Sequence, residues 1–101
     1  MKLLVVTCIN ENLNDVMTLF NKSAINVFSI VNATGIKSGP ESDILENWFG
    51  SAEGEYDSVM LFSFTTQKAA EETMRQIRSF NDETRSPFPV RVFILPVDKA
   101  N

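Results

Sequence analysis

The apolar residues of this 101-residue chain gather in four short runs, separated by stretches rich in turn-forming residues. The runs are Lys2 to Ile9, Val27 to Thr34, Ser58 to Thr65 and Val90 to Pro96. Their β-branched and aromatic residues are typical of strands. Pro96 lacks a backbone N–H, so the pairing of the last strand should end there. We therefore predict four strands.

Two segments between these runs repeat with the period of a helix. In the first, Asn12 followed by Asp15 resembles a capped helix start. Its apolar positions recur at i, i+3, i+4 and i+7 and are Leu13, Val16, Met17 and Phe20. The second helix is capped by Thr65 or Thr66. Its buried stripe consists of Ala70, Met74 and Ile77, with Phe80 nearby.

The resulting order, strand-helix-strand-strand-helix-strand, predicts an α+β fold: a ferredoxin-like sandwich with an antiparallel sheet. A hydrophobic content of 44% suits one small core. No composition shift or linker divides the chain, so we predict a single domain over residues 1–101.

Composition narrows the functional classes. The formal net charge is −4, and no cluster of Lys and Arg is present, which argues against nucleic-acid binding. The N-terminal apolar run is too short for a membrane span and lacks a signal-peptide cleavage pattern. We expect a cytoplasmic protein that does not insert into a membrane. The single cysteine excludes an internal disulfide framework.

The segment from about residue 36 to 57 is much longer than an ordinary connection between strands. It is acidic and contains an adjacent aromatic pair, Trp48 and Phe49. We interpret it as a loop that binds a partner protein, with the aromatic pair as its anchor. The alternative is that this pair folds back onto the protein's own surface. The candidate partner-binding residues are Glu41, Asp43, Trp48, Phe49, Glu53 and Glu55.

The predicted strands carry large apolar side chains on both faces of the sheet. In a ferredoxin-like sandwich, two helices cover only one face. An uncovered apolar face would exceed what monomers normally expose. We therefore expect self-association through the sheet into a closed cyclic oligomer, with Ile30 among the interface positions.

At this point the chain resembles the PII signalling proteins and their PII-like relatives over essentially its whole length. The closing strand carries the most specific part of the likeness, because Arg91 to Val97 follows the family's Lys-Ile-Phe-Val-Leu-Pro-Val pattern with conservative changes. Further matching positions are Met1, Lys2, Leu13, Val16 and Gly35. The resemblance implies a homotrimer, a loop that docks on a target such as a membrane transporter or a metabolic enzyme, and an adenine nucleotide or related effector between subunits.

The chain departs from the family where phosphates would bind. Lys37 stands where a second glycine is expected, and Pro87 and Pro89 remove backbone N–H donors from the turn before the last strand. The family's basic tail is also missing before Asn101. We therefore expect weak or absent ATP binding, with another small anionic effector, or none, in the cleft. The candidate ligand-binding residues are Gly35, Ile36, Lys37, Ser38, Arg85, Val90 and Arg91.

Enzymatic chemistry has little support. The chain has no histidine, which removes histidine-based acid–base chemistry and metal ligation. We interpret Cys8 as a core residue, and we predict neither a catalytic nor a metal site. The leading hypothesis is a non-enzymatic PII-like regulator. A metal-responsive or metal-tolerance protein, either CutA-like or associated with metal efflux, is the alternative, and a small ferredoxin-like enzyme ranks last.

Overall fold

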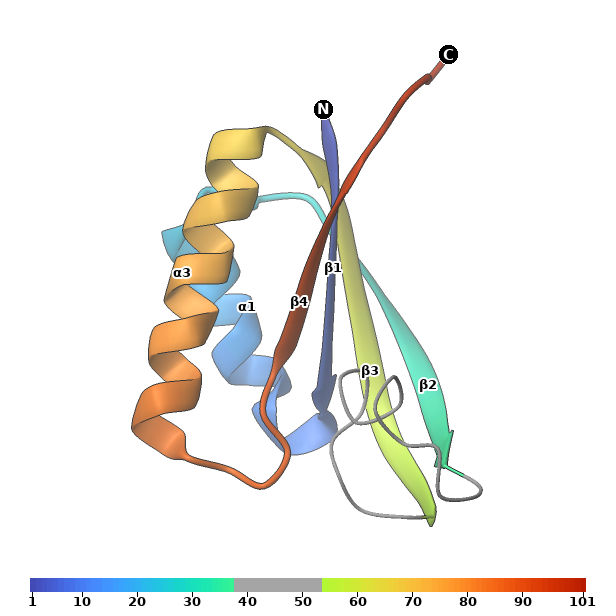
Figure 1. Cartoon of the computed structure of the whole chain (residues 1–101), viewed down its shortest axis with the longest axis vertical. Helices are drawn as coiled ribbons and strands as arrows, with labels where there is room; N and C mark the ends of the chain where they lie inside the picture. Colours follow the sequence, from blue (N-terminus) through green and yellow to red (C-terminus); the bar gives the residue numbers. More distant parts are fainter. Residues whose placement is uncertain (38–53) are drawn as a thin grey trace.

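The computed structural model describes residues 1–37 and 54–101, and within these ranges four strands form one antiparallel sheet with two helices on one side (Figure 1). The strands are β1 (Lys2–Ile9), β2 (Ser29–Lys37), β3 (Gly54–Thr65) and β4 (Arg91–Pro96). The helices are α1 (Leu13–Lys22) and α3 (Gln67–Thr84), and a short 3-10 turn, η1 (Asn10–Asn12), precedes α1. The sheet order is β2-β3-β1-β4. The α+β ferredoxin-like prediction is confirmed.

The middle hairpin extends further than the sequence pattern indicated. β2 begins two residues after Val27 but continues to Lys37, which pairs with Gly54. β3 begins four residues before Ser58. Ladder hydrogen bonds involve only the backbone, so pairing continues into residues whose side chains are not apolar. Part of the segment that was predicted as a loop therefore belongs to two strands.

The two helices begin differently. The side chain of Asn12 makes no capping hydrogen bond, because η1 leads directly into α1 and already gives Asn12 a helical backbone. The predicted cap at this position is therefore wrong. At α3 the Thr66 hydroxyl accepts a hydrogen bond of 3.1 Å from the Ala69 N–H, which confirms the predicted threonine cap.

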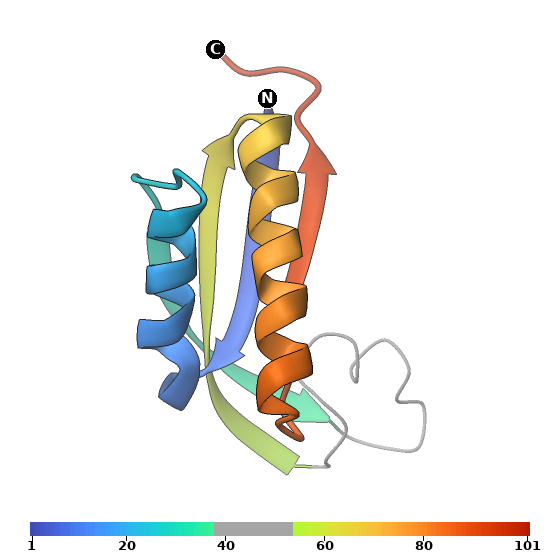
Figure 2. The same ribbon diagram turned by 90° about the vertical axis from the view of Figure 1, so that its left-hand side faces the viewer.

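The core lies between the helices and the sheet, and Figure 2 shows the two helices side by side over the strands. Phe20 is fully buried, and its ring meets that of Phe28 edge to face at a centroid distance of 5.0 Å. The other buried apolar residues include Leu4, Val6, Cys8, Val16, Val59, Leu61, Ala70 and Ile77. Neither helix in the described part of the chain is both long and apolar enough to span a membrane.

Candidate functional site

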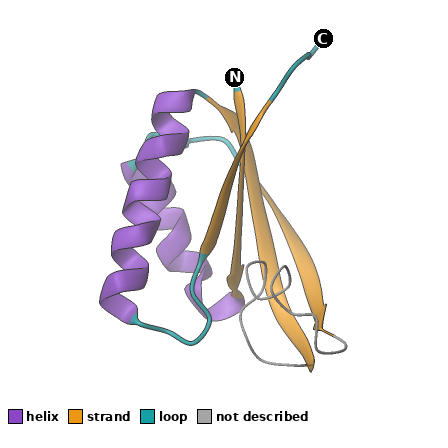
Figure 3. Ribbon diagram, in the orientation of Figure 1, coloured by secondary structure: helices purple, strands orange, loops and turns teal. Residues whose placement is uncertain are grey.

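Both helices lie on one side of the sheet (Figure 3), and the side chains on its other face are mostly apolar. Residues that pair directly across antiparallel strands share a face. Val5 pairs with both Phe62 and Phe93, which makes one apolar row across three strands. We call this surface the open face; it consists of Leu3, Val5, Val31, Met60, Phe62, Phe64, Phe93 and Leu95. Phe64 is 59% exposed there.

Two adjacent residues of β2 separate the two faces. Ile30 pairs with the buried Leu61, so it lies on the helix-covered side of the sheet. Val31 pairs with Met60 and belongs to the open face. Both are about equally exposed, at 44% and 42%. Ile30 is exposed because β2 is an edge strand that the helices do not fully cover, and Val31 is exposed because it lies on the open face. The expectation that Ile30 lies on the uncovered face is therefore wrong; Val31 occupies that place.

The candidate ligand residues lie at opposite edges of the sheet. Gly35 is on β2 and Arg91 begins β4, with β3 and β1 between them. At a strand spacing of about 4.8 Å, β2 and β4 are roughly 14 Å apart. Arg91 pairs with Thr7, Thr7 pairs with Met60, and Met60 pairs with Val31, so Arg91 and Val31 lie at the same level across the sheet. Gly35 is four residues beyond Val31, which adds a displacement of about 13 Å along the strand. One copy of the chain does not bring Gly35 and Arg91 together.

The remaining candidates divide between the two edges. Ile36 is 59% exposed on β2 beside Gly35. Lys37 ends that strand, and Ser38 lies outside the described residues. Arg85 is exposed and adopts a left-handed backbone, with φ 48°, where α3 ends. The partner-binding residues Glu41, Asp43, Trp48, Phe49 and Glu53 also lie outside the described residues, and Glu55 is placed in β3 through its backbone.

Asn81, which the sequence did not single out, fixes the turn before β4. Its side-chain amide donates to the Val90 carbonyl at 2.8 Å, and its side-chain oxygen accepts from the Val90 N–H at 2.9 Å. Val90 itself is only 1% exposed and packs in the core. Asn81 thus holds the residue immediately before Arg91. A polar residue in the last turn of a helix, just before a proline-rich turn, was the available signal.

Cys8 is a buried free thiol on the core side of β1. Burial raises the pKa of this thiol from 9.0 to about 11, since the thiolate is poorly solvated there. Within the described residues, no group of three or more His, Cys, Asp or Glu is arranged to hold a metal ion.

The raised pKa of Cys8 predicts a loss of stability at alkaline pH. Between pH 9 and 11 the unfolded thiol ionises while the native thiol stays protonated, so the contribution present below pH 9 disappears as the pH rises. The loss should reach about 2 to 3 kcal/mol above pH 11. Urea unfolding at several pH values should show this slope in the wild type and not in Cys8→Val. Equal slopes in the two proteins would contradict the prediction.

Comparison with known proteins identifies the fold. No protein-family model matches the chain, and no curated protein matches it by sequence. A solved structure of a PII-like signalling protein from Thermus thermophilus matches with a TM-score of 0.63 at 10% identity, covering 92% of this chain and 80% of that one. CPII, a nitrogen regulatory PII-like protein from Thiomonas intermedia bound to ADP, AMP and bicarbonate, matches with a TM-score of 0.60 at 16% identity, covering 99% and 94%. The chain has the fold of the PII-like signalling proteins, as the resemblance in its sequence indicated.

Proposed function

We propose that this protein is a non-enzymatic PII-like regulator that assembles as a homotrimer and binds a small anionic effector between its subunits. The observation that carries the proposal is the match in fold to two PII-like proteins over 92% and 99% of the chain. The open face supports the assembly independently of that match.

Assembly follows from the open face. Large apolar side chains, Phe64 among them, face water in a single copy of the chain. Contiguous apolar surface of this kind marks an interaction site in soluble proteins. Because the helices cover the other side of the sheet, packing of copies through the open face would bury this surface without disturbing the core.

The effector site in this proposal is built by two copies. Gly35 and Arg91 lie at opposite edges of the sheet in one chain, so a cleft that uses both needs the β2 edge of one copy beside the β4 edge of another. Arg91 and Arg85 supply positive charge, and Gly35 allows close approach of the backbone. ADP, AMP and bicarbonate, which are bound to the Thiomonas protein, are the first effectors to test.

Calorimetric titration with ADP, AMP, ATP and bicarbonate tests the effector site. We expect an anion other than ATP to bind, because Pro87 and Pro89 remove N–H donors that ATP phosphates would use. Arg91→Ala should weaken that binding by about 1.5 to 3 kcal/mol, the usual loss for hydrogen bonds to a charged group. Arg78→Ala, an exposed change on α3, is the matched control. Unchanged affinity of Arg91→Ala would remove Arg91 from the site, and micromolar ATP binding would refute the expected selectivity.

Target recognition is assigned in this proposal to the segment that contains Trp48 and Phe49. The targets to be tried are a membrane transporter and a metabolic enzyme. With a target in hand, Trp48→Ala should weaken the complex by about 2 kcal/mol if the indole is an interface hot spot. Surface plasmon resonance gives the affinity of the target for the wild-type protein, for Trp48→Ala and for the control variant Glu71→Gln. Equal affinities would move the contact to another surface.

A further inference from the structure

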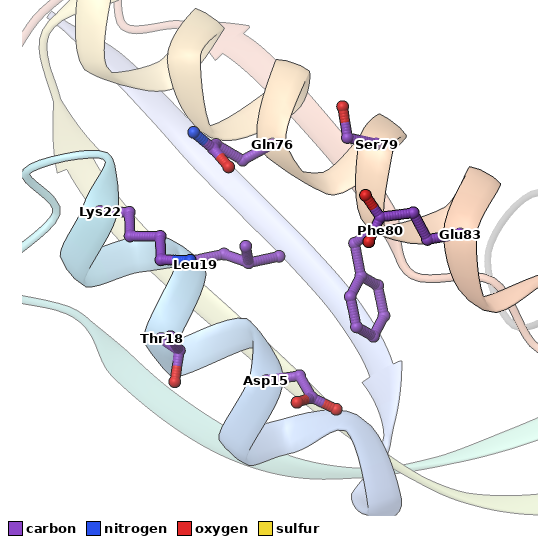
Figure 4. Close-up of a pocket in the computed structure, with 8 residues that line it drawn as sticks. All are labelled: Asp15, Thr18, Leu19, Lys22, Gln76, Ser79, Phe80 and Glu83. Carbon is purple, nitrogen blue, oxygen red and sulfur yellow. The ribbon is translucent and has the colours of Figure 1, made fainter.

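A groove of about 280 Å³ lies between α1 and α3 (Figure 4), the two helices on the side of the sheet opposite the open face (Figure 1). On each helix the lining residues recur at i, i+3, i+4 and i+7, so each helix contributes a single face. They are Asp15, Thr18, Leu19 and Lys22 from α1, and Gln76, Ser79, Phe80 and Glu83 from α3. The volume is close to the lower limit for small-molecule sites, which suits a compact ligand.

The two ends of the groove carry opposite charge. Asp15 and Glu83 lie at the end beside the Phe80 ring, and Lys22 lies across from Gln76 at the other end (Figure 4). Leu19, which is 9% exposed, and Phe80 give the groove an apolar floor. The groove therefore has a polar axis with an aliphatic surface between its charged ends.

Existing hydrogen bonds leave acceptor atoms available along this axis. The Gln76 amide nitrogen donates to Glu72 at 3.1 Å, and Figure 4 shows the Gln76 oxygen on the groove side. Within residues 1–37 and 54–101, the three charged lining residues form no ion pair with one another. A bound molecule would thus meet two carboxylates at one end and one ammonium at the other.

We propose that this groove binds a small zwitterion whose ammonium and carboxylate are separated by a short aliphatic chain. The ammonium binds at the acidic end, beside Asp15 and the Phe80 ring, the carboxylate meets Lys22, and the chain covers the apolar floor. Asp15 and Lys22 are seven residues apart, so their backbone positions are about 10 Å apart along the helix. We expect an α-amino acid, with both groups on one carbon, to reach only one end. An ω-amino acid fits this spacing.

The site is independent of the proposed assembly and of the effector cleft. The helices lie on the opposite side of the sheet from the open face, so the groove stays accessible when copies pack through that face (Figure 1). The lining charges are exposed, and exposed ion pairs contribute little each, so we expect a dissociation constant on the order of 1 mM.

A nitrogen-15 NMR titration of the 101-residue protein with 5-aminopentanoate tests the proposal. Amide signals of α1 and α3 should shift and saturate. Pentylamine and pentanoate, which each keep one charged end, should bind at least about fivefold more weakly because each loses one charge contact. Shifts that never saturate, or pentylamine binding as tightly as the zwitterion, would overturn the proposal.

Matched surface variants complete the test. Asp15→Asn and Lys22→Met should each weaken binding of 5-aminopentanoate at least about fivefold, because each removes one charge at one end of the groove. Glu71→Gln and Lys68→Met change exposed charges of α3 outside the groove and should bind like wild type. An equal loss in both pairs would show a general charge effect and refute the site. The effect of Arg91→Ala on effector binding is a separate measurement, and neither of its outcomes changes the interpretation of 5-aminopentanoate binding to the groove.

Discussion

Val31→Lys should convert the proposed trimer into monomers, whereas Ile30→Lys, one residue earlier on β2, should leave it assembled. The two side chains are nearly equally exposed, at 42% and 44%, but Val31 lies on the open face and Ile30 on the helix-covered side. A lysine at Val31 would place an ammonium inside an apolar interface, where an uncompensated charge is strongly unfavourable. At Ile30 the same ammonium can reach water at the edge of the sheet.

Sedimentation equilibrium of the two variants beside wild type measures this difference. Because both changes add one lysine to neighbouring edge positions, effects on net charge and on strand propensity cancel between them. Dissociation of both variants, or of Ile30→Lys alone, would mean that the interface is not the open face. Circular dichroism should show that both variants keep the native secondary structure.

Asn81→Ala should lower the free energy of unfolding by about 3 kcal/mol. The side chain makes two hydrogen bonds to the backbone of Val90, which is 1% exposed, and removing it leaves a shielded N–H and C=O without those partners. Each such group costs about 1 to 3 kcal/mol, and the gain in helix propensity on changing Asn to Ala offsets only part of it. The variant should also weaken effector binding, because Val90 precedes Arg91.

Urea unfolding at one fixed protein concentration gives the change, since the stability of an oligomer depends on concentration. Ser79→Ala, two residues earlier and exposed on the same helix, is the control with a similar gain in helix propensity. If Asn81→Ala unfolds at the same urea concentration as Ser79→Ala, the turn before β4 does not depend on the Asn81 bonds.

The sequence allowed the order of elements and the threonine cap of α3 to be predicted, because these depend on local periodicity and capping chemistry. The predicted stripe of α3 was right at Ala70 and Ile77 but wrong at Met74, which is only half-buried, while Thr73 is buried in its place. The side of the sheet on which Ile30 lies could not be predicted in the same way. In a strand with apolar residues at consecutive positions, only the pairing register decides which side chain meets the helices. In this sheet Ile30 pairs with the buried Leu61, which places Ile30 on the helix-covered side.

The sequence predicted which residues could form the candidate site but not where they lie relative to one another. The resemblance to PII proteins singled out Gly35 and Arg91, but their placement at opposite edges depends on the sheet order. Asn81 was missed because its two bonds join residues nine positions apart, around a turn whose shape no local pattern specifies. The α1–α3 groove likewise required the relative placement of two helices.

Native mass spectrometry of the wild-type protein, with ADP added, tests both the proposed trimer and its effector site. It reports the number of copies in the assembly and the ligand that each assembly retains. We expect a species of three times the 11.3 kDa chain mass, with any bound ADP found on that species alone. A protein that remains at the mass of a single chain, or that retains ADP as a monomer, would contradict it.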